Sequence, residues 1–178
     1  MARTRKQKIC PFTVIADTRE QAPFGFMSIE PWDKIEVESR ALQTGDYSIV
    51  GFESVISVER KSVSDFYHSI GSDRERFERE MVRLQQMEFA AVVIEGNWKE
   101  LLIDRPDTIQ MSAKSASNTI YSWSVRYGVH FWTCDGRRHA ELTTFRLLWH
   151  FWKQQQEKNK DIDWIDDAIE EALEATLF

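Results

Sequence analysis

Short apolar runs alternate with polar turns along most of the chain, and this pattern predicts alternating strands and helices. We expect strands where apolar residues run together or alternate with polar ones, at residues 13–17, 35–41, 46–50, 55–61, 89–95 and 130–134. Helices are expected where apolar residues recur every three or four positions, at residues 62–71, 73–87, 98–103, 115–127 and 140–156. A meander of strands followed by alternating helices and strands is typical of an α/β fold with a mixed central sheet flanked by helices.

The pattern indicates one domain over residues 12–156, with a basic N-terminal arm at 1–11 and an acidic tail at 157–178. A chain of 178 residues is long enough for one domain with its own core. The arm holds four basic residues and no acid, whereas the tail holds eight acids and two lysines. The tail is expected to form a short amphipathic helix with its apolar side on Ile162, Ile165, Ile169 and Leu173. Its default role is to solubilise, and docking on a partner or mimicry of DNA charge stay open.

Composition excludes several classes of protein. Hydrophobic residues make up 42% of the chain and aromatic residues 12%, which excludes wholesale disorder. No apolar run approaches the ~20 residues of a membrane span, and no apolar stretch of a secretory signal follows the basic start. We therefore expect a cytoplasmic protein without a membrane partner, and Cys10 and Cys134, which lack metal-ligand spacing, fit a reducing compartment. The net charge of −6 comes from the tail, so a nucleic-acid partner is not excluded.

Two acids and a lysine are expected to meet where neighbouring strands end, within the segment TGDYSIVGFESVISVERK. Glu59 and Lys61 are two residues apart on a predicted strand and share one face, and Asp46 on the neighbouring strand can converge on them. Two carboxylates can hold a hard divalent cation such as Mg²⁺, and the lysine can orient or deprotonate a water, or stabilise charge on a phosphate. The plain alternatives are a solvated strand face for the E-x-K and a turn-forming role for Asp46.

Residues on either side extend this candidate site. Asp17 ends the first predicted strand and is followed by Arg19 and Glu20, so the two acids reach the same site if that strand is central. Asp65, three residues after Ser62, has helix capping as its alternative role.

A predicted helix downstream is rich in arginine. Arg76, Arg79 and Arg83 are spaced to line one face, where they could bind phosphates. Pairing of Glu75 with Arg79 on a solvated face is the alternative.

These residues, in this order, resemble the GDxnERKxxxD signature of the XPF-type structure-specific nuclease family. The signature stands here as Gly45-Asp46, Glu59-Arg60-Lys61 and Asp65. The DTRE before it, and the His-Ser-Ile, RERFERE and VVIEG segments after it, extend the resemblance over roughly residues 12–152. The resemblance implies a restriction-endonuclease-like, PD-(D/E)xK core.

The resemblance also implies an activity and a set of roles. The activity is Mg²⁺- or Mn²⁺-dependent cleavage of DNA at branched or junction structures, leaving a 3′-hydroxyl and a 5′-phosphate. Metal-ligand roles are implied for Asp46, Glu59 and Asp17, a catalytic role for Lys61, and catalytic or supporting roles for Glu20, Arg60 and Asp65. Arg76 matches a basic position that faces DNA, and Arg19, Arg79 and Arg83 are further DNA-binding candidates. On an alternating strand Arg60 points away from Lys61, so we expect it to form an ion pair behind the site.

Family members usually dimerise through the nuclease domain. An apolar stripe on the last long helix could supply part of a homodimer surface, although most of it is expected to pack on the sheet; it comprises Leu142, Phe145, Leu148, Trp149 and Trp152. Many members also carry helix-hairpin-helix modules, and no such pattern is visible in the acidic C-terminal region. We therefore expect a stand-alone module of the phage or bacterial kind, working at a nucleoid or in a host cytoplasm, with its preference for forks or flaps open.

Two alternative functions and one unexplained cluster remain. A non-catalytic DNA-binding or scaffold subunit on the same fold is the main alternative, but inactive partners tend to lose acids that this chain keeps. An RNA nuclease or a plain nickase would share the chemistry. Arg137 and Arg138 precede a predicted helix, where positive charge is unfavourable, so they suggest either a phosphate contact or a tolerated surface cluster.

Overall fold

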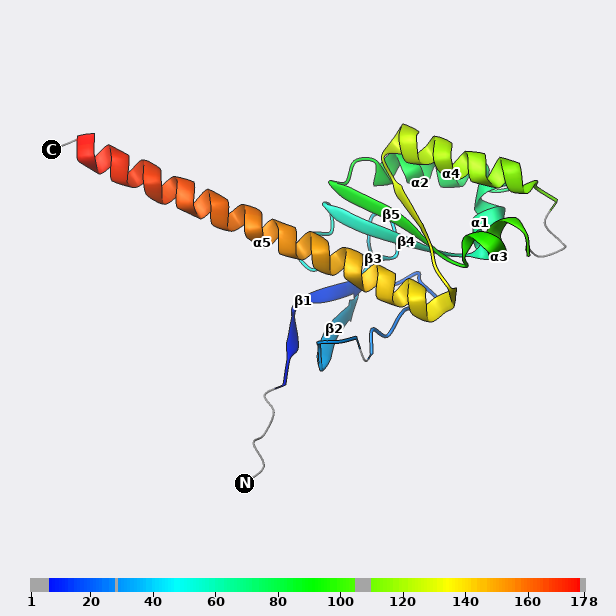
Figure 1. The fold of residues 1–178 in the computed structure, drawn as a ribbon, viewed down its shortest axis with the longest axis horizontal. Helices are drawn as coiled ribbons and strands as arrows, with labels where there is room; N and C mark the ends of the chain where they lie inside the picture. Colours follow the sequence, from blue (N-terminus) through cyan, green and yellow to red (C-terminus); the bar gives the residue numbers. More distant parts are fainter. Residues whose placement is uncertain (1–6, 28, 105–109, 177–178) are drawn as a thin grey trace, which may run out of the picture.

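The computed structural model describes residues 7–27, 29–104 and 110–176, with side chains up to residue 160. Within this part of the chain six strands form one sheet: β1 (Ile9–Ala16), β2 (Lys34–Ser39), β3 (Tyr47–Ile49), β4 (Ile56–Ser62), β5 (Phe89–Glu95) and β6 (His130–Thr133). The helices are α1 (Val63–Ile70), α2 (Arg74–Leu84), α3 (Trp98–Leu102), α4 (Ala113–Tyr127) and α5 (Gly136–Thr176). Figure 1 shows the helices on both sides of the sheet, with the far part of α5 projecting away from it.

The strand order is β2-β1-β3-β4-β5-β6, and the sheet is mixed. β1 and β2 are parallel, β3 runs antiparallel to both of its neighbours, and β4, β5 and β6 are parallel. This arrangement confirms the predicted mixed sheet flanked by helices. Because β4 and β5 are parallel neighbours in the middle, the ends of both strands lie at the same edge of the sheet.

The two faces of the sheet support two separate cores. On one face, Phe145, Leu148 and Phe151 of α5 pack against β1, β3 and β4. On the other face, α1, α2 and α4 pack against alternate residues of β5. Both faces of β5 are buried, because Val92 and Ile94 join one core and Val93 the other. This explains why the strand is a continuous apolar run rather than an alternating one.

β1 begins four residues before the predicted strand, inside the segment expected to be an arm. Cys10 and Phe12 are buried with the α5 core, so the alternating pattern extends upstream. The pairing with β2 shifts register between Ile9 and Thr13. Pro11 lies at this irregularity, and it has no N–H to donate to a ladder. Residues 1–6 of the expected arm lie outside the described residues.

A single helix replaces the two that were predicted near the C-terminus. α5 runs from Gly136 to Thr176 without a break at residue 157, because residues 137–176 contain no Gly or Pro to interrupt it. Its contacts with the domain reach Lys158, which pairs with Glu88 at 2.5 Å. The expected apolar side of the tail, from Ile162 to Leu173, lies outside the described side chains, and the loop around Pro106 lies mostly outside the described residues.

None of the helices searched within the described residues combines the length and the hydropathy that crossing a membrane requires.

Candidate active site

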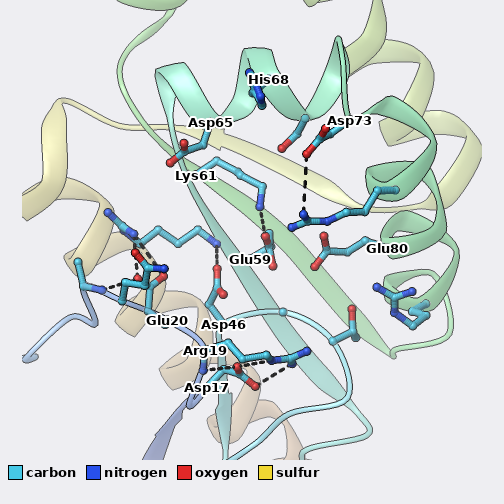
Figure 2. Close-up of a pocket in the computed structure, with 18 of the residues that line it drawn as sticks. Asp17, Arg19, Glu20, Asp46, Glu59, Lys61, Asp65, His68, Asp73 and Glu80 are labelled. Carbon is cyan, nitrogen blue, oxygen red and sulfur yellow. Dashed lines mark hydrogen bonds and ion pairs between the residues drawn. The ribbon is translucent and has the colours of Figure 1, made fainter.

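A polar cleft of about 560 Å³ opens at the edge of the sheet where β1 and β4 end and β3 begins. Its lining includes every acid predicted for the site: Asp17, Glu20, Asp46, Glu59 and Asp65. Lys61 and the helices α1 and α2 complete it, as Figure 2 shows. The three distant segments of the sequence signature therefore meet in one place.

Asp46 is fixed by the backbone on either side of it. Its N–H donates to the Val58 carbonyl at 3.0 Å, and its own carbonyl accepts from the Asp17 N–H at 2.8 Å. The carboxylate accepts from the Arg60 N–H at 2.7 Å, so Asp46 lies directly beside β4. Burial raises the pKa of Asp46 to about 6, although the Arg60 N–H and the Lys61 charge act in the opposite direction.

Gly45 makes this position possible. It has a φ of +73°, and a Cβ on it would lie 1.9 Å from Ser57 Oγ on β4. Only glycine tolerates both the left-handed backbone and this close approach. The glycine of the GD pair therefore has a steric role that the sequence pattern alone does not reveal.

Glu59 and Lys61 lie on one face of β4, as their spacing predicts, and form an ion pair. Their side chains are only 5% and 14% exposed. Lys61 Nζ also lies 5.1 Å from the centre of the Phe77 ring of α2. Burial and the Asp46 charge hold the pKa of Glu59 well above its ordinary value. Burial lowers the pKa of Lys61, but Glu59, Glu80 and Asp46 together raise it by more, so the net shift is upward and the lysine stays charged.

Glu80 is an acid of the cleft that sequence reasoning missed. α2 carries it to the cleft, where it is half-buried and its charge raises the pKa of Glu59. Figure 2 shows the two carboxyl groups facing each other beside Lys61. The available signal was its position three residues after Phe77, at the border of the buried stripe of the helix.

Asp17 lies in the cleft wall, but its carboxylate is bound to Arg19. Oδ1 accepts from Arg19 N at 2.8 Å and Nε at 2.7 Å, and Oδ2 accepts from Arg19 Nη2 at 2.9 Å and Leu42 N at 2.6 Å. Burial raises the pKa of Asp17, and these hydrogen bonds lower it by more, so the net shift is downward. The side chain thus fixes the chain after β1, while that of Arg19 stays 69% exposed at the cleft.

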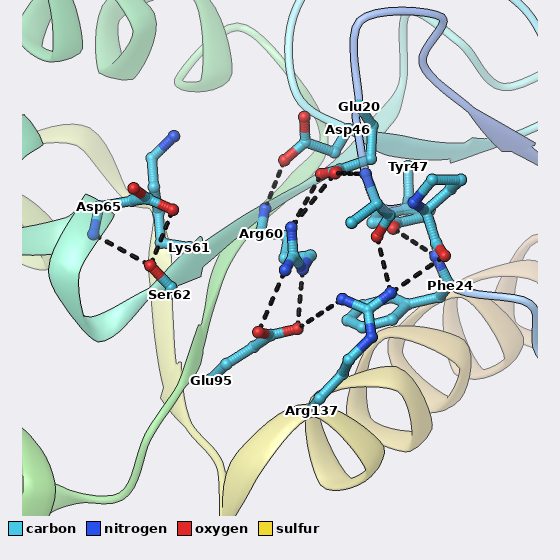
Figure 3. Close-up of polar contacts among 12 residues, drawn as sticks. Glu20, Phe24, Asp46, Tyr47, Arg60, Lys61, Ser62, Asp65, Glu95 and Arg137 are labelled. Atoms are coloured by element: carbon cyan, nitrogen blue, oxygen red, sulfur yellow. Dashed lines mark hydrogen bonds and ion pairs between the residues drawn. The ribbon is translucent and has the colours of Figure 1, made fainter.

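Arg60 points to the opposite face of β4 from Lys61, as the alternation predicts, and pairs with Glu95 and Glu20 (Figure 3). Its Nε and Nη2 donate to Glu95 at 2.7 and 3.1 Å, and its Nη1 donates to both oxygens of Glu20 at 3.2 Å. Glu20 also accepts the Ala22 N–H at 2.8 Å. Arg60 therefore anchors the loop after β1 to the end of β5.

Arg137 joins the same network from the first turn of α5. It donates to Glu95 at 3.2 Å and to the carbonyls of Ala22 and Pro23 at 2.7 and 3.0 Å. Its guanidinium lies 4.9 Å from the centre of the Phe24 ring, and that of Arg60 lies 5.6 Å from the same ring. These internal contacts explain a basic residue at this helix start without a phosphate.

The remaining predicted residues line the rim. Asp65 lies in the first turn of α1, where its backbone N–H donates to Ser62 Oγ, which confirms its place in a helix cap. Arg76 and Arg83 line the cleft. Arg79 lies instead in a second hollow between α2 and α4, which Arg83 also borders. Among the described residues, the ion pairs within this segment join Arg74 to Glu78 and Arg76 to Asp73.

The donor set of the cleft suits a hard cation. Among the described residues, no three Asp, Glu, His or Cys side chains are placed so that they could hold a metal ion together. Asp46 and Glu59 nevertheless both line the cleft, close enough for the Asp46 charge to act on Glu59. One or two carboxylates plus several waters is the usual coordination of Mg²⁺.

Comparisons with known proteins agree with this geometry. The family model of the ERCC4 domain matches residues 16–145. Two solved structures are similar at 22% sequence identity: XPF from Aeropyrum pernix (TM-score 0.59, over 76% of this chain and 59% of that one) and XPF from Aeropyrum pernix in complex with DNA (TM-score 0.60, over 80% of this chain and 66% of that one). This chain therefore spans less than two thirds of either structure. A search of curated proteins finds no match. The likeness confirms the predicted restriction-endonuclease-like fold.

Proposed function

The chain belongs to the ERCC4 domain family of nucleases, and we propose that it is a metal-dependent DNA endonuclease whose active site is the cleft at the end of β4. The observation that carries the proposal is the meeting of Asp46, Glu59 and Lys61 in that cleft. Two carboxylates and an ammonium group are the side chains that metal-assisted hydrolysis of a phosphodiester requires.

We assign the metal to Asp46 and Glu59, with Mg²⁺ or Mn²⁺ as the ion. A bound divalent cation supplies Lewis acidity and lowers the pKa of a bound water. Asp17 is not assigned as a direct ligand, because both of its oxygens already accept hydrogen bonds from Arg19. Its proposed role is to hold the chain after β1 in place.

Lys61 is proposed to act on the reacting groups. Lys61 Nζ pairs with Glu59 in this structure, and with Glu59 turned to a cation it would be free to donate a hydrogen bond to a phosphate oxygen or to the attacking water. The water oxygen bonds to phosphorus as the bond to the 3′ oxygen breaks, and that oxygen takes up a proton. The products are a 3′-hydroxyl and a 5′-phosphate.

The rim of the cleft is proposed to contact DNA phosphates. Arg19, Arg76 and Arg83 line it, and the side chain of Arg76 is 77% exposed. Arg79 can extend this contact toward the hollow between α2 and α4. Such contacts position a duplex without reading its sequence. The substrate class we propose, branched or junction DNA, is supported by the family and by the similar XPF structure in complex with DNA.

We also propose a homodimer. Phe145 and Leu148 of the predicted apolar stripe are buried in the core and are not available for a second copy. Trp149 and Trp152 remain only partly buried and form an aromatic cluster with Trp32 and Phe12. This cluster is the part of the stripe that a second copy can cover. Sedimentation at micromolar concentration should then give twice the chain mass, and a monomer would count against the dimer.

The activity is tested by incubating the purified protein with labelled DNA and RNA. The substrates are duplex, single strand, flap, fork and four-way junction, each with Mg²⁺, Mn²⁺ or chelator at a stated salt concentration. We expect metal-dependent cuts in flap or fork DNA that Asp46→Asn and Lys61→Ala abolish while folding is retained. Cleavage that both variants leave undiminished would refute the site. Binding of DNA without any cleavage would instead favour the non-catalytic alternative.

A further inference from the structure

Glu80 reaches the cleft floor from a helix that the nuclease signature does not include. Phe77 and Met81, which lie before and after Glu80 on α2, are buried and pack the helix against the sheet. Phe77 packs against Lys61, and Glu80, one turn further on, faces Glu59 in the cleft (Figure 2). The strand and the helix therefore fix the Glu80 carboxyl beside the proposed metal ligands.

Within the described part of the chain, several acids around the cleft are paired with arginines, but the three acids around Lys61 are not. Asp17 is neutralised by Arg19, while Glu20 and Glu95 are neutralised together by two arginines, Arg60 and Arg137. Among the described residues, Asp46, Glu59 and Glu80 line the cleft beside Lys61, the only ammonium group there, while Arg19, already paired with Asp17, also interacts with Asp46 and Glu80. When all three carboxyl groups are ionised, they and the Lys61 ammonium carry a net charge of −2, which one divalent cation would balance.

We propose that Glu80 is a third acidic group of the metal site and that it binds the ion through a metal-bound water. The inference rests on the proposed function. Within the part of the chain that the structure describes, no three acids are placed to ligate one ion directly. Asp46 and Glu59 would therefore take the direct positions, and Glu80 would accept a hydrogen bond from a coordinated water. Outer contacts of this kind orient the bound water and raise the affinity for the metal.

The proposal is tested on metal binding without DNA. Mn²⁺ binding to the full chain is measured by electron paramagnetic resonance for the wild type, Glu80→Gln, Glu80→Asp and Asp46→Asn. The matched control is Glu78→Gln on the same helix, because Glu78 pairs with Arg74 and does not line the cleft. We expect Glu80→Gln to weaken Mn²⁺ binding about tenfold or more. Glu80→Asp should recover part of that loss, Asp46→Asn should abolish binding, and Glu78→Gln should change nothing.

Thermal unfolding separates a metal role from a structural one. In chelator, Glu80→Gln should unfold at or above the wild-type temperature, because an amide can donate to Glu59 where a carboxylate repels it. On adding Mn²⁺, the variant should gain less stability than the wild type. An equal gain, or wild-type Mn²⁺ affinity, would overturn the role of Glu80 while leaving the proposed nuclease intact. A wild type that neither binds Mn²⁺ nor cleaves DNA would overturn both.

Discussion

Arg60 and Glu95 form a two-pronged ion pair on the face of the sheet opposite Lys61. The two side chains are 14% and 11% exposed, so neither is well solvated. Through Glu20 and Arg137 the pair ties the loop after β1 and the start of α5 to the strands that carry the site. Arg60, the arginine of the ERK triplet, therefore stabilises the structure around the cleft, and we assign it no contact with the reacting groups.

Replacing Glu95 by Gln should destabilise the fold and lower kcat more than it raises KM. The change leaves Arg60 and Arg137 short of one negative charge, and we expect a loss of about 1–3 kcal/mol in the free energy of unfolding. Denaturant unfolding and steady-state cleavage measure the two effects. Glu36→Gln is the control, because its ion pair with Lys34 is about half-exposed and should contribute little. Equal stability of the two variants would contradict the proposed anchor.

Gly45→Ala should destabilise the protein by about 2 kcal/mol or more, because a Cβ there would overlap Ser57 Oγ and the backbone is left-handed. Gly51→Ala is the matched control: its φ is +88°, but nothing lies within 4 Å of the new Cβ, so only backbone strain of about 1 kcal/mol remains. Chemical denaturation compares the two. A loss for Gly45→Ala no larger than that for Gly51→Ala would show that the close approach is unimportant.

Asp46 should make the metal-free protein less stable as pH rises. Its pKa in the folded protein, about 6, lies above the ordinary value of 3.8. The folded state therefore binds more protons than the unfolded state between these values, and the stability contribution of this group falls as pH rises through that window. In chelator, Asp46→Asn should melt a few degrees above the wild type at pH 8, and this difference should shrink toward pH 4.5. A difference that does not change with pH would contradict the burial argument.

Arg76 and Arg83 should each contribute about one unit to the slope of log DNA affinity against log salt concentration. Each neutralised phosphate contributes about 0.9 to the slope of log affinity against log salt concentration. Replacing either arginine by Gln should reduce the slope by about that amount, measured by fluorescence anisotropy in chelator with a flap DNA. Arg146→Gln is the control, because Arg146 is exposed on α5, away from the cleft lining. Unchanged slopes for both cleft variants would show that the DNA binds to another surface of the protein.

The core of the site could be predicted because strand periodicity and turn chemistry are local. The two-residue period of β4 places Glu59 and Lys61 on one face and Arg60 on the other, and the structure shows this arrangement. The Gly-Asp turn next to β4 was equally visible in the sequence.

The remaining parts depend on how distant elements pack. Glu80 reaches Glu59 only because α2 lies against the face of β4, and Arg137 reaches Glu95 only because α5 begins beside β5. No local pattern encodes such a meeting. The early start of β1 and the unbroken α5 differ from the prediction, because charge and composition do not set the ends of these elements. The alternating pattern of β1 continues upstream, and α5 has no helix-breaking residue at position 157.

The most direct measurement of the central claim is anomalous X-ray diffraction from crystals of the full chain grown with Mn²⁺. We predict a single strong peak in the cleft, within bonding distance of a carboxylate oxygen of Asp46 and one of Glu59. Crystals with Mn²⁺ in excess but no peak in the cleft, or with the two carboxylates turned away from any ion, would contradict the metal-dependent nuclease.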